Sequence, residues 1–214
     1  MVLNKVRAEI GRLHVITGNG DGSRPSRFPA ELARCALQGG ADTIQYRDKS
    51  GDVRRMLQEA SEVLKVCREF SVPMIVNDRV DLCLAVGADG VHLGLTDMPV
   101  KTARRILGAG RIIGATIRGV PDLERVQEES ADYVGLGPIF RTSSKQVPVE
   151  PLGLDIVRQV AEVARIPVIG IAGITHENLS DVLRAGAFGV AVIGAVSQAS
   201  DPEAAARGLR GMMP

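Results

Sequence analysis

Two cations and an amide follow one short apolar run near the start of the chain. In the segment QYRDK, alternate residues point the same way when the chain is extended. Gln45, Arg47 and Lys49 therefore share one face. Tyr46 and Asp48 share the other. Arg47 offers a planar fork of donors and Lys49 a compact charge, a combination suited to a diphosphate or another di-anion. The alternative is a salt-bridged strand end, with Asp48 as one candidate partner for these cations.

Two carboxylates follow later apolar runs. Asn77 and Asp78 end one run, and Asp97 follows the next. Paired carboxylates near the two cations indicate Mg²⁺, which typically takes one or two protein carboxylates and completes its shell with waters and phosphate oxygens. The alternative is that Asn77 or Asp78 caps one helix and Asp97 caps the next.

A hydroxyl-rich segment and two glycine-containing turns are further candidates for anion binding. The segment RTSSK, with Thr142, Ser144 and Lys145, combines hydroxyls, backbone N–H groups and a cation, which together make a phosphate cradle. A surface loop has the same composition. Two later apolar runs end near Gly173 and Gly194, where barrels often bind phosphate, although glycines there can also serve only to turn the chain.

Eight short apolar runs precede or carry these polar residues. They are nearly continuous hydrophobic segments, the pattern of parallel strands covered on both faces. Segments with helical periodicity separate them, so strand alternates with helix along the chain. The runs are LHVIT from Leu13, DTIQY from Asp42, PMIVN from Pro73, GVHLG from Gly90, RIIGA from Arg111, DYVGLG from Asp132, PVIGI from Pro167 and GVAVIG from Gly189.

A short sequence repeat precedes every second run. A small residue that ends a helix and turns into the next strand recurs in this way when a barrel is built from βαβα quarters. Gly-Ala-Asp often ends helices without further meaning, but four occurrences at corresponding positions favour a repeat. The four are GAD at Gly40, GAD at Gly87, SAD at Ser130 and GAF at Gly186.

The last repeat closes a segment with clear helical spacing. In THENLSDVLRAG, Leu179, Val182 and Leu183 lie on one stripe. We expect this helix to begin with Thr175 as its capping residue and to stop at Gly186.

These patterns predict an α/β fold, a single (β/α)8 TIM barrel with parallel strands that spans residues 1–214. The length suits one domain with one large core. An open doubly wound sheet uses the same units, but the chain lacks the G-x-G-x-x-G fingerprint after its first strand. In a barrel, residues at the carboxyl ends of the strands meet in one site, which brings the polar residues above together.

Charge and composition exclude some partners. Lys and Arg total 26 and Asp and Glu total 25, so the chain has no global attraction to nucleic acid or to an acidic membrane.

Cys35, Cys67 and Cys83 lack C-x-x-C spacing and lie in apolar helical patterns, which predicts reduced core residues. No apolar run is long enough to span a bilayer, and the N-terminal segment lacks the apolar stretch of a secretory signal. We therefore expect a cytoplasmic protein, and a homo-oligomer is compatible with this expectation.

The segments QYRDK, VNDRVDLCLAVGADGVHLG, ADYVGLGPIFRTSSK and IPVIGIAGI resemble motifs of the thiamine-phosphate synthase family, which also includes thiazole tautomerase-like relatives. The motifs come in the family's order, and the resemblance covers nearly the whole chain. It implies a transferase that joins hydroxymethylpyrimidine diphosphate to thiazole phosphate, releases pyrophosphate and requires Mg²⁺. It also implies a dissociative displacement, in which departing diphosphate leaves a cationic pyrimidine methylene for the thiazole nitrogen to attack.

The resemblance also implies roles for individual residues of this chain. Asp78 and Asp97 would bind Mg²⁺. The residues with an implied catalytic role, around the diphosphate or the reacting centre, are Arg47, Lys49, Thr116 and Lys145. The residues implied to bind substrate are Gln45, His92 and Tyr133 near the pyrimidine, Asn77, Thr142 and Ser144 around the diphosphate, and Gly173, Ile193 and Gly194 around the thiazole phosphate.

The chain departs from the family pattern at several positions. The family commonly has Gln where Leu95 stands, Pro where Arg141 stands and Ser where Gly194 stands. It has Ser-x-His where this chain has TIR from Thr116, and tautomerase relatives look to that histidine for proton transfer. A tautomerase with Arg118 at this position would lack its acid–base group.

Three functions are compatible with the sequence. The first is the transferase described above. The second is an isomerase or tautomerase that acts on a phosphorylated small molecule, with His92 or a carboxylate as base. The third is a non-catalytic barrel that binds a phosphate ligand, which the substitutions at Leu95 and Gly194 permit. Pyrophosphate release with Mg²⁺ distinguishes the first from the second, and binding without turnover identifies the third.

Overall fold

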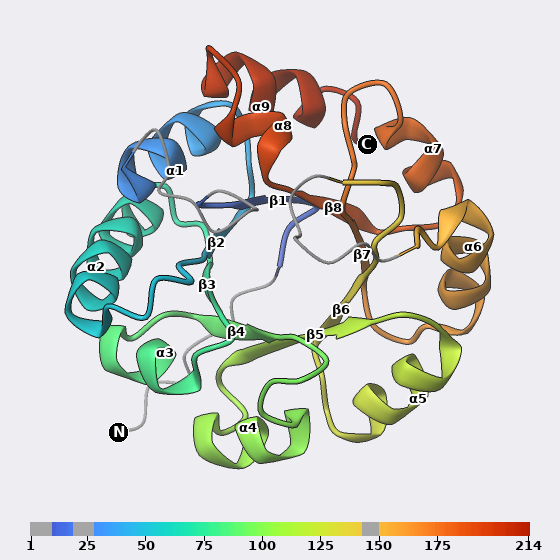
Figure 1. Cartoon of the computed structure of the whole chain (residues 1–214), viewed down its shortest axis with the longest axis horizontal. Helices are drawn as coiled ribbons and strands as arrows, with labels where there is room; N and C mark the ends of the chain where they lie inside the picture. Colours follow the sequence, from blue (N-terminus) through green and yellow to red (C-terminus); the bar gives the residue numbers. More distant parts are fainter. Residues whose placement is uncertain (1–9, 19–27, 143–149) are drawn as a thin grey trace.

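Eight parallel strands close into a barrel with helices around its outside (Figure 1). The structure, a computed structural model, describes residues 10–18, 28–142 and 150–214. Each strand pairs with its neighbour in the chain, and the last strand pairs with the first to close the ring. The predicted (β/α)8 barrel is therefore confirmed, and the open doubly wound sheet is excluded.

The strands coincide with the eight apolar runs, and each begins within one residue of the run that predicts it. Nearly all their side chains are buried, because helices cover the outer face of the sheet and the barrel closes over the inner face. The strands are β1 (Leu13–Ile16), β2 (Thr43–Tyr46), β3 (Met74–Asn77), β4 (Gly90–Leu93), β5 (Ile112–Ile117), β6 (Tyr133–Leu136), β7 (Val168–Ile171) and β8 (Gly189–Val192).

Helices form the outer ring and bury their apolar stripes against the sheet (Figure 1). In the described part of the chain they are α1 (Pro29–Gln38), α2 (Val53–Glu69), α3 (Val80–Val86), α4 (Val100–Leu107), α5 (Val120–Glu128), α6 (Gly153–Val163), α7 (Leu179–Arg184), α8 (Gly194–Ser197) and α9 (Pro202–Arg210). The last helix, α9, packs against α1 and so completes the ring.

The interior of the barrel holds a second, smaller core. Its largest side chain is Tyr133 on β6, which is 1% exposed. Space for this ring comes from Gly114 on the neighbouring strand β5, because a Cβ atom there would lie 2.1 Å from Tyr133 Cζ. The barrel is thus filled by side chains, and a ligand must bind at its mouth. The buried members of this inner core are Ile16, Ile75, Ile112, Tyr133, Ile169 and Ala191.

The sequence repeat is confirmed in the backbone. Each small residue of the repeat stands three positions before its strand and adopts the left-handed region of φ. This conformation ends a helix and redirects the chain into the following strand, as predicted. The φ values are 93° at Gly40, 74° at Gly87, 70° at Ser130 and 103° at Gly186.

The aspartates of this repeat join neighbouring strands. In three of the four units, the carboxylate accepts a hydrogen bond from a backbone N–H near the start of the preceding strand, a group that would otherwise need another partner. We call these contacts the carboxylate latches. They join Asp42 Oδ1 to Leu13 N at 2.7 Å, Asp89 Oδ2 to Met74 N at 2.9 Å, and Asp132 Oδ2 to Ile113 N at 2.7 Å.

The fourth unit has Phe188 in place of the aspartate and so lacks a latch. Phe188 N still donates to Val168 O at 2.9 Å, which keeps the backbone link between β8 and β7. The Arg12 guanidinium lies 4.9 Å from the centroid of the Phe188 ring, in a cation–π contact. Because Arg12 directly precedes β1, this contact lies where β8 and β1 close the barrel.

One helix begins later than predicted. α7 starts at Leu179 instead of Thr175, and Asn178 precedes it as the N-cap residue. Thr175 N donates to Asn178 Oδ1 at 2.9 Å, and Thr175 Oγ1 donates to Glu177 Oε2. These side-chain bonds hold residues 175–178 in a turn, which delays the helix. Gly186 follows the end of α7, as predicted.

The cysteines are free thiols, as predicted. Cys67 and Cys83 are buried, and Cys35 on α1 is half-buried. Within the described residues, no helix combines the length and the apolar character needed to cross a membrane.

Candidate functional site

The carboxyl end of β2 separates its side chains onto two faces, as predicted. Gln45 and Tyr46 are both buried. Tyr46 Oη donates to Glu59 Oε2 on α2 at 3.0 Å, so Tyr46 faces the helical layer. Lys49 instead reaches the end of β3, where its Nζ forms an ion pair with the carboxylate of Asp78.

Asp48 pairs with a helix and does not neutralise Lys49. Its Oδ2 lies 2.8 Å from Arg55 Nη2 on α2. The alternative of a salt-bridged strand end is thus confirmed for Lys49, but its partner is Asp78 and not Asp48. Lys49 stays at the rim, beside the carboxylates.

Neither Asp78 nor Asp97 caps a helix. α3 has Arg79 as its N-cap residue and α4 has Pro99, and neither helix has a side-chain cap. Asp97 Oδ2 instead accepts the Gly94 N–H at 2.6 Å, which folds the β4–α4 turn back on itself. The capping alternative is thereby excluded for both carboxylates.

Asp78 and Asp97 lie close enough for their charges to interact. Burial raises the pKa of Asp97, and the neighbouring Asp78 carboxyl raises it further, while the Gly94 N–H and Lys49 oppose the rise. A divalent cation relieves such repulsion, and Mg²⁺ needs only one or two protein carboxylates. Among the described residues no group of three or more acidic, His or Cys side chains is arranged to hold a metal ion. The donor set therefore fits Mg²⁺ better than a metal that needs a full cage of protein ligands.

The backbone of Asp78 is held in an unusual conformation. Its φ is 62°, in the left-handed region, which Asp and Asn tolerate better than most residues. Asp78 N donates to His92 O at 2.8 Å, and Arg79 N donates to Asn77 O at 2.8 Å. These bonds fix the Asp78 backbone against the end of β4, and such local strain is typical of functional sites.

His92 lies between two hydroxyl groups. Its Nδ1 is 3.0 Å from Tyr133 Oη, and its Nε2 is 3.0 Å from Thr116 Oγ1. Burial raises the pKa of Tyr133, so the phenol stays protonated. Asn77 stands opposite His92 in the pairing of β3 with β4. The structure thus joins Tyr133, His92 and Thr116 in one chain of contacts.

The ends of β7 and β8 form another part of the rim. Gly173 has a φ of 67°, and the Arg141 carbonyl oxygen would lie 2.4 Å from a Cβ there, so this close approach requires glycine. Ile193 packs against the inner core, and Gly194 begins α8. A Cβ at Gly194 would lie 3.3 Å from Gln198 Oε1, so a serine there would require the Gln198 amide to shift slightly.

The hydroxyl-rich segment is only partly described. Thr142 is half-buried and is the last described residue before it. Ser144 and Lys145, both predicted to bind the diphosphate, lie outside the described residues.

Comparisons with known proteins identify the family of this chain. A family model described as thiamine monophosphate synthase matches residues 13–196. A thiamine-phosphate synthase from Salinibacter ruber is 47% identical over 201 residues, which cover 93% of this chain and 88% of the relative. One from Chloroflexus aurantiacus is 43% identical over 202 residues, covering 94% of this chain and 92% of the relative. The chain belongs to the thiamine monophosphate synthase family.

A solved structure extends the comparison to the fold. The thiamine phosphate pyrophosphorylase from Pyrococcus furiosus superposes with a TM-score of 0.85 and 37% sequence identity, covering 94% of each chain. The resemblance of the sequence motifs to the thiamine monophosphate synthase family is therefore confirmed at the level of the whole barrel.

The departures from the pattern of the thiamine monophosphate synthase family lie around the rim. Leu95 is 51% exposed in the β4–α4 turn, two residues before Asp97. Arg118 is half-buried and directly follows β5, where its N–H donates to Asp122 Oδ2 at 2.9 Å. Arg141 is exposed. Each of these three substitutions follows the carboxyl end of a strand, and none of them replaces Asp78 or Asp97.

The sequence did not predict the contacts of Gln198 or those of Arg55 and Glu59. Gln198 lies four residues after Gly194, so helical spacing is the signal that could have indicated its contact with the start of α8. Arg55 and Glu59 show the same spacing on α2, but their contacts with Asp48 and Tyr46 cross from helix to strand. No local pattern predicts those contacts.

Proposed function

We propose that this protein is a thiamine-phosphate synthase that joins hydroxymethylpyrimidine diphosphate to thiazole phosphate and releases pyrophosphate. The observation that carries the proposal is the carboxylate pair Asp78 and Asp97 with Lys49 beside it at the rim of the barrel. The two carboxylates can bind a divalent cation, and the Lys49 ammonium lies next to them. This combination suits a diphosphate better than a single phosphate ester. Membership of the thiamine monophosphate synthase family supports the same reaction.

Binding of the diphosphate falls to the cations and amide at the ends of β2 and β3. Arg47 and Lys49 provide the positive charge, and Asn77 provides a side-chain donor. Thr142, together with Ser144 and Lys145 from the segment beyond it, completes the cradle in this proposal. The resulting field favours departure of the diphosphate, because it stabilises negative charge as that charge develops.

The metal site belongs to the same side of the rim. Asp78 and Asp97 are the residues that would hold Mg²⁺. When bound, Mg²⁺ supplies charge neutralisation for the leaving diphosphate. The Asp97 carboxylate is oriented for this role by the Gly94 N–H, and Asp78 by its fixed backbone.

The pyrimidine side of the site is built on β2, β4 and β5. Gln45 and His92 supply polar atoms at the mouth of the barrel, and the Thr116 hydroxyl lies beside the reacting centre. Tyr133 holds the His92 ring in place through the 3.0 Å contact with Nδ1. A cationic pyrimidine intermediate needs no protein nucleophile, so these residues orient the ring and exclude water.

Thiazole phosphate is assigned to the ends of β7 and β8. Gly173, Ile193 and Gly194 supply a turn of backbone there, and loops after these two strands often bind phosphate in barrels. The ends of β7 and β8 lie across the mouth of the barrel from Asp78 and Asp97. The thiazole nitrogen can therefore approach the pyrimidine methylene from the face opposite to the diphosphate.

The isomerase alternative is less consistent with the geometry. Both ring nitrogens of His92 lie within hydrogen-bond distance of protein hydroxyls, which favours a positioning role over that of a free base. Arg118 stands where tautomerase relatives have histidine, and its guanidinium cannot act as a base near neutral pH.

The reaction itself tests the proposal. Purified protein is incubated with hydroxymethylpyrimidine diphosphate, thiazole phosphate and Mg²⁺, and thiamine phosphate and pyrophosphate are both quantified. We expect equimolar products that depend on Mg²⁺, and strongly reduced turnover in Arg47→Ala. Folded protein that forms neither product above a control without enzyme would refute the synthase function.

A further inference from the structure

The backbone of Arg47 is fixed from the β1 side. Arg47 N donates to Thr17 Oγ1 at 3.3 Å. Gly18 lies against the Arg47 carbonyl oxygen, which would be 2.6 Å from a Cβ on this glycine, and its φ of 98° also requires glycine. The residue that is predicted to bind the diphosphate is therefore held by the segment that follows β1.

The next residue, Asp48, is fixed from the α2 side. Its Oδ1 accepts Ser50 N at 2.6 Å, and its Oδ2 accepts Ser50 Oγ at 2.9 Å and Arg55 Nη2 at 2.8 Å. Burial alone would raise the pKa of Asp48, but the hydrogen bonds from Arg55 and Ser50 outweigh burial and lower it. Asp48 is consequently an ionised carboxylate that accepts from Ser50 in its own loop and from Arg55 on α2.

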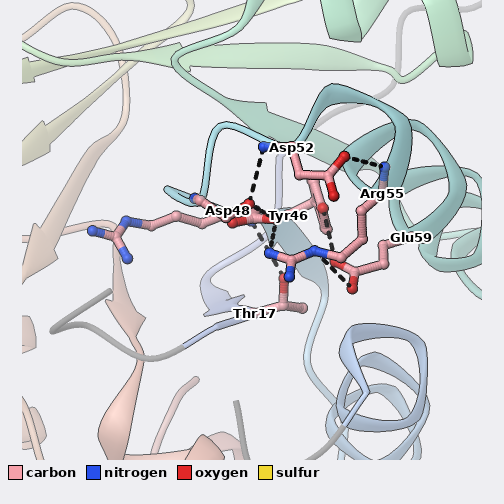
Figure 2. Close-up of polar contacts among 8 residues, drawn as sticks. Thr17, Tyr46, Asp48, Asp52, Arg55 and Glu59 are labelled. Carbon is pink, nitrogen blue, oxygen red and sulfur yellow. Dashed lines mark hydrogen bonds and ion pairs between the residues drawn. The ribbon is translucent and has the colours of Figure 1, made fainter. Parts of the chain in front are cut away.

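Arg55 links this carboxylate to a second one, as Figure 2 shows. Arg55 Nε lies 3.7 Å from Glu59 Oε1, and Glu59 Oε2 accepts the Tyr46 hydroxyl at 3.0 Å. Tyr46 is the last residue of β2, so the contacts run from the strand to α2 and back to Asp48. Arg55 N also donates to Asp52 Oδ1 at 3.1 Å, which starts the helix at the same place. We call Tyr46, Asp48, Arg55 and Glu59 the β2–α2 network.

The network has a geometric consequence for its neighbours in the chain. In an extended segment, side chains alternate between faces, so drawing Tyr46 and Asp48 toward α2 directs Arg47 and Lys49 to the opposite face. Lys49 fulfils this expectation, since its ammonium reaches Asp78 at the end of β3. Arg55 contacts Asp48 and Glu59 contacts Tyr46, the two residues that alternate with the cations along the chain.

We infer that Arg55 and Glu59 are positioning residues for diphosphate recognition, acting through Asp48 and Tyr46 to orient Arg47 and Lys49. This inference rests on the proposed function, because it presumes that the two cations bind a diphosphate. It predicts that damage to the β2–α2 network weakens binding of pyrophosphate selectively and leaves thiazole phosphate unaffected. A network that served stability alone would affect both ligands equally, or neither.

Binding of the product pyrophosphate provides the direct test. Arg55→Ala is titrated with pyrophosphate and Mg²⁺ by calorimetry, well below its unfolding temperature, and the KM for thiazole phosphate is measured at saturating pyrimidine diphosphate. We expect the pyrophosphate Kd to rise about tenfold, since small misplacements of binding groups have effects of that order or larger. The KM for thiazole phosphate should stay within about twofold.

Matched variants separate positioning from general damage. Arg207→Ala on α9 removes an exposed arginine from a comparable pair with Glu203, four residues away, and should change neither constant. Arg55→Lys retains a charge for Asp48 but cannot bridge both carboxylates, so its pyrophosphate Kd should lie between those of wild type and Arg55→Ala. Asp48→Asn should raise the Kd as well. The effect of the double variant Asp48→Asn/Arg55→Ala on the binding free energy of pyrophosphate should be smaller than the sum of the two single effects, because both changes break one network.

The outcomes distinguish the two proposals. If the wild-type protein forms no thiamine phosphate, the synthase function fails, whatever the variants do. If the wild type is active but Arg55→Ala and Asp48→Asn bind pyrophosphate normally, the positioning role is refuted and the function stands. An equal rise in the thiazole phosphate KM would also refute it.

Discussion

Asp78 unites a left-handed backbone with a carboxylate that contacts Lys49 and neighbours Asp97. A substitution at this position therefore changes both the charge and the conformational strain. Asn tolerates positive φ nearly as well as Asp, so Asp78→Asn removes the charge while leaving the turn intact. An alanine would confound the two effects.

Asp78→Asn should weaken the interaction with Mg²⁺, because one of two anionic ligands is lost. We expect the Mg²⁺ concentration for half-maximal turnover to rise about tenfold or more, which corresponds to about 1.4 kcal/mol of binding free energy. Asp97→Asn should act in the same direction. Steady-state rates over a Mg²⁺ titration measure both effects. Asp81→Asn, which alters an exposed aspartate paired with Arg79, is the control, and an equal shift there would assign the effect to general surface charge.

Thr116 offers a test of a single hydroxyl. Thr116→Val keeps the branched shape and removes the oxygen that lies 3.0 Å from His92 Nε2. We expect kcat to fall about 100-fold if this hydroxyl stabilises the reacting centre, since the loss of one such donor typically has that effect. Thr116→Ser should retain most of the activity. Similar kcat values for the Val and Ser variants would show that the hydroxyl has no catalytic role.

At the scale of elements, the carboxylate latches tie the starts of β1, β3 and β5 to the turns that precede β2, β4 and β6. They lie at the opposite ends of the strands from the candidate site, where residues of barrels serve stability. Removal of a latch leaves a backbone N–H without its acceptor, and an unsatisfied buried donor is costly.

Asp89→Ala should destabilise the fold without impairing the site. We expect the free energy of unfolding to fall by about 1–3 kcal/mol, because Met74 N loses its partner and Arg68 loses its ion pair. Urea unfolding measures this change, and turnover at a temperature where the variant is folded should stay near the wild-type value. Asp181→Ala, in an exposed pair with Arg184, should change stability by no more than about 0.5 kcal/mol. Equal losses in both variants would contradict the latch.

The elements themselves could be predicted because their signals are local. Near-continuous apolar runs located all eight strands, and the small residues before Thr43, Gly90, Tyr133 and Gly189 located the turns. The start of α7 could not be predicted in this way. Helical spacing extends back to Thr175, but the side chains of Thr175 and Asn178 satisfy a competing turn, and periodicity alone does not report that competition.

For the molecule as a whole, the barrel interior couples stability to pH through His14. This residue is 1% exposed, with Nε2 3.0 Å from Gly11 O and its ring 5.5 Å from that of Tyr133. Burial lowers the pKa of His14 to about 4, although the Gly11 carbonyl and Asp42 oppose part of the shift. The folded protein therefore keeps this imidazole neutral under conditions in which the unfolded chain protonates it.

The sign of the pH effect follows from linkage. Between the unfolded pKa of 6.5 and the folded value of about 4, the unfolded chain binds more protons, so stability falls as the pH falls through this window. We expect His14 to contribute a loss of about 2 kcal/mol between pH 7 and pH 5. In His14→Gln this part of the pH dependence should vanish, as measured by urea unfolding at both pH values. His176→Gln alters an exposed histidine and should retain it. Identical pH dependence in wild type and His14→Gln would contradict the assignment.

The site was less predictable than the barrel that carries it. Strand ends identified Asp78, Asp97 and Lys49, because the fold brings all carboxyl ends to one rim. Contacts with other residues determine how these side chains are oriented. The β2–α2 network directs Lys49, and the Gly94 N–H orients Asp97. Contacts of this kind depend on three-dimensional packing between elements, for which a single sequence carries no periodic signal.

The carboxylate latches also bear on the order in which the barrel is made. Each latch joins two strands that follow one another in the chain, so it can form as soon as the ribosome has released both. The unit that contains Phe188 is different, since its contact is with Arg12, which is synthesised near the beginning. A nascent chain can thus assemble three strand pairs in succession while it is still tethered, whereas Arg12 cannot meet Phe188 and seal the ring until Phe188 has also been released.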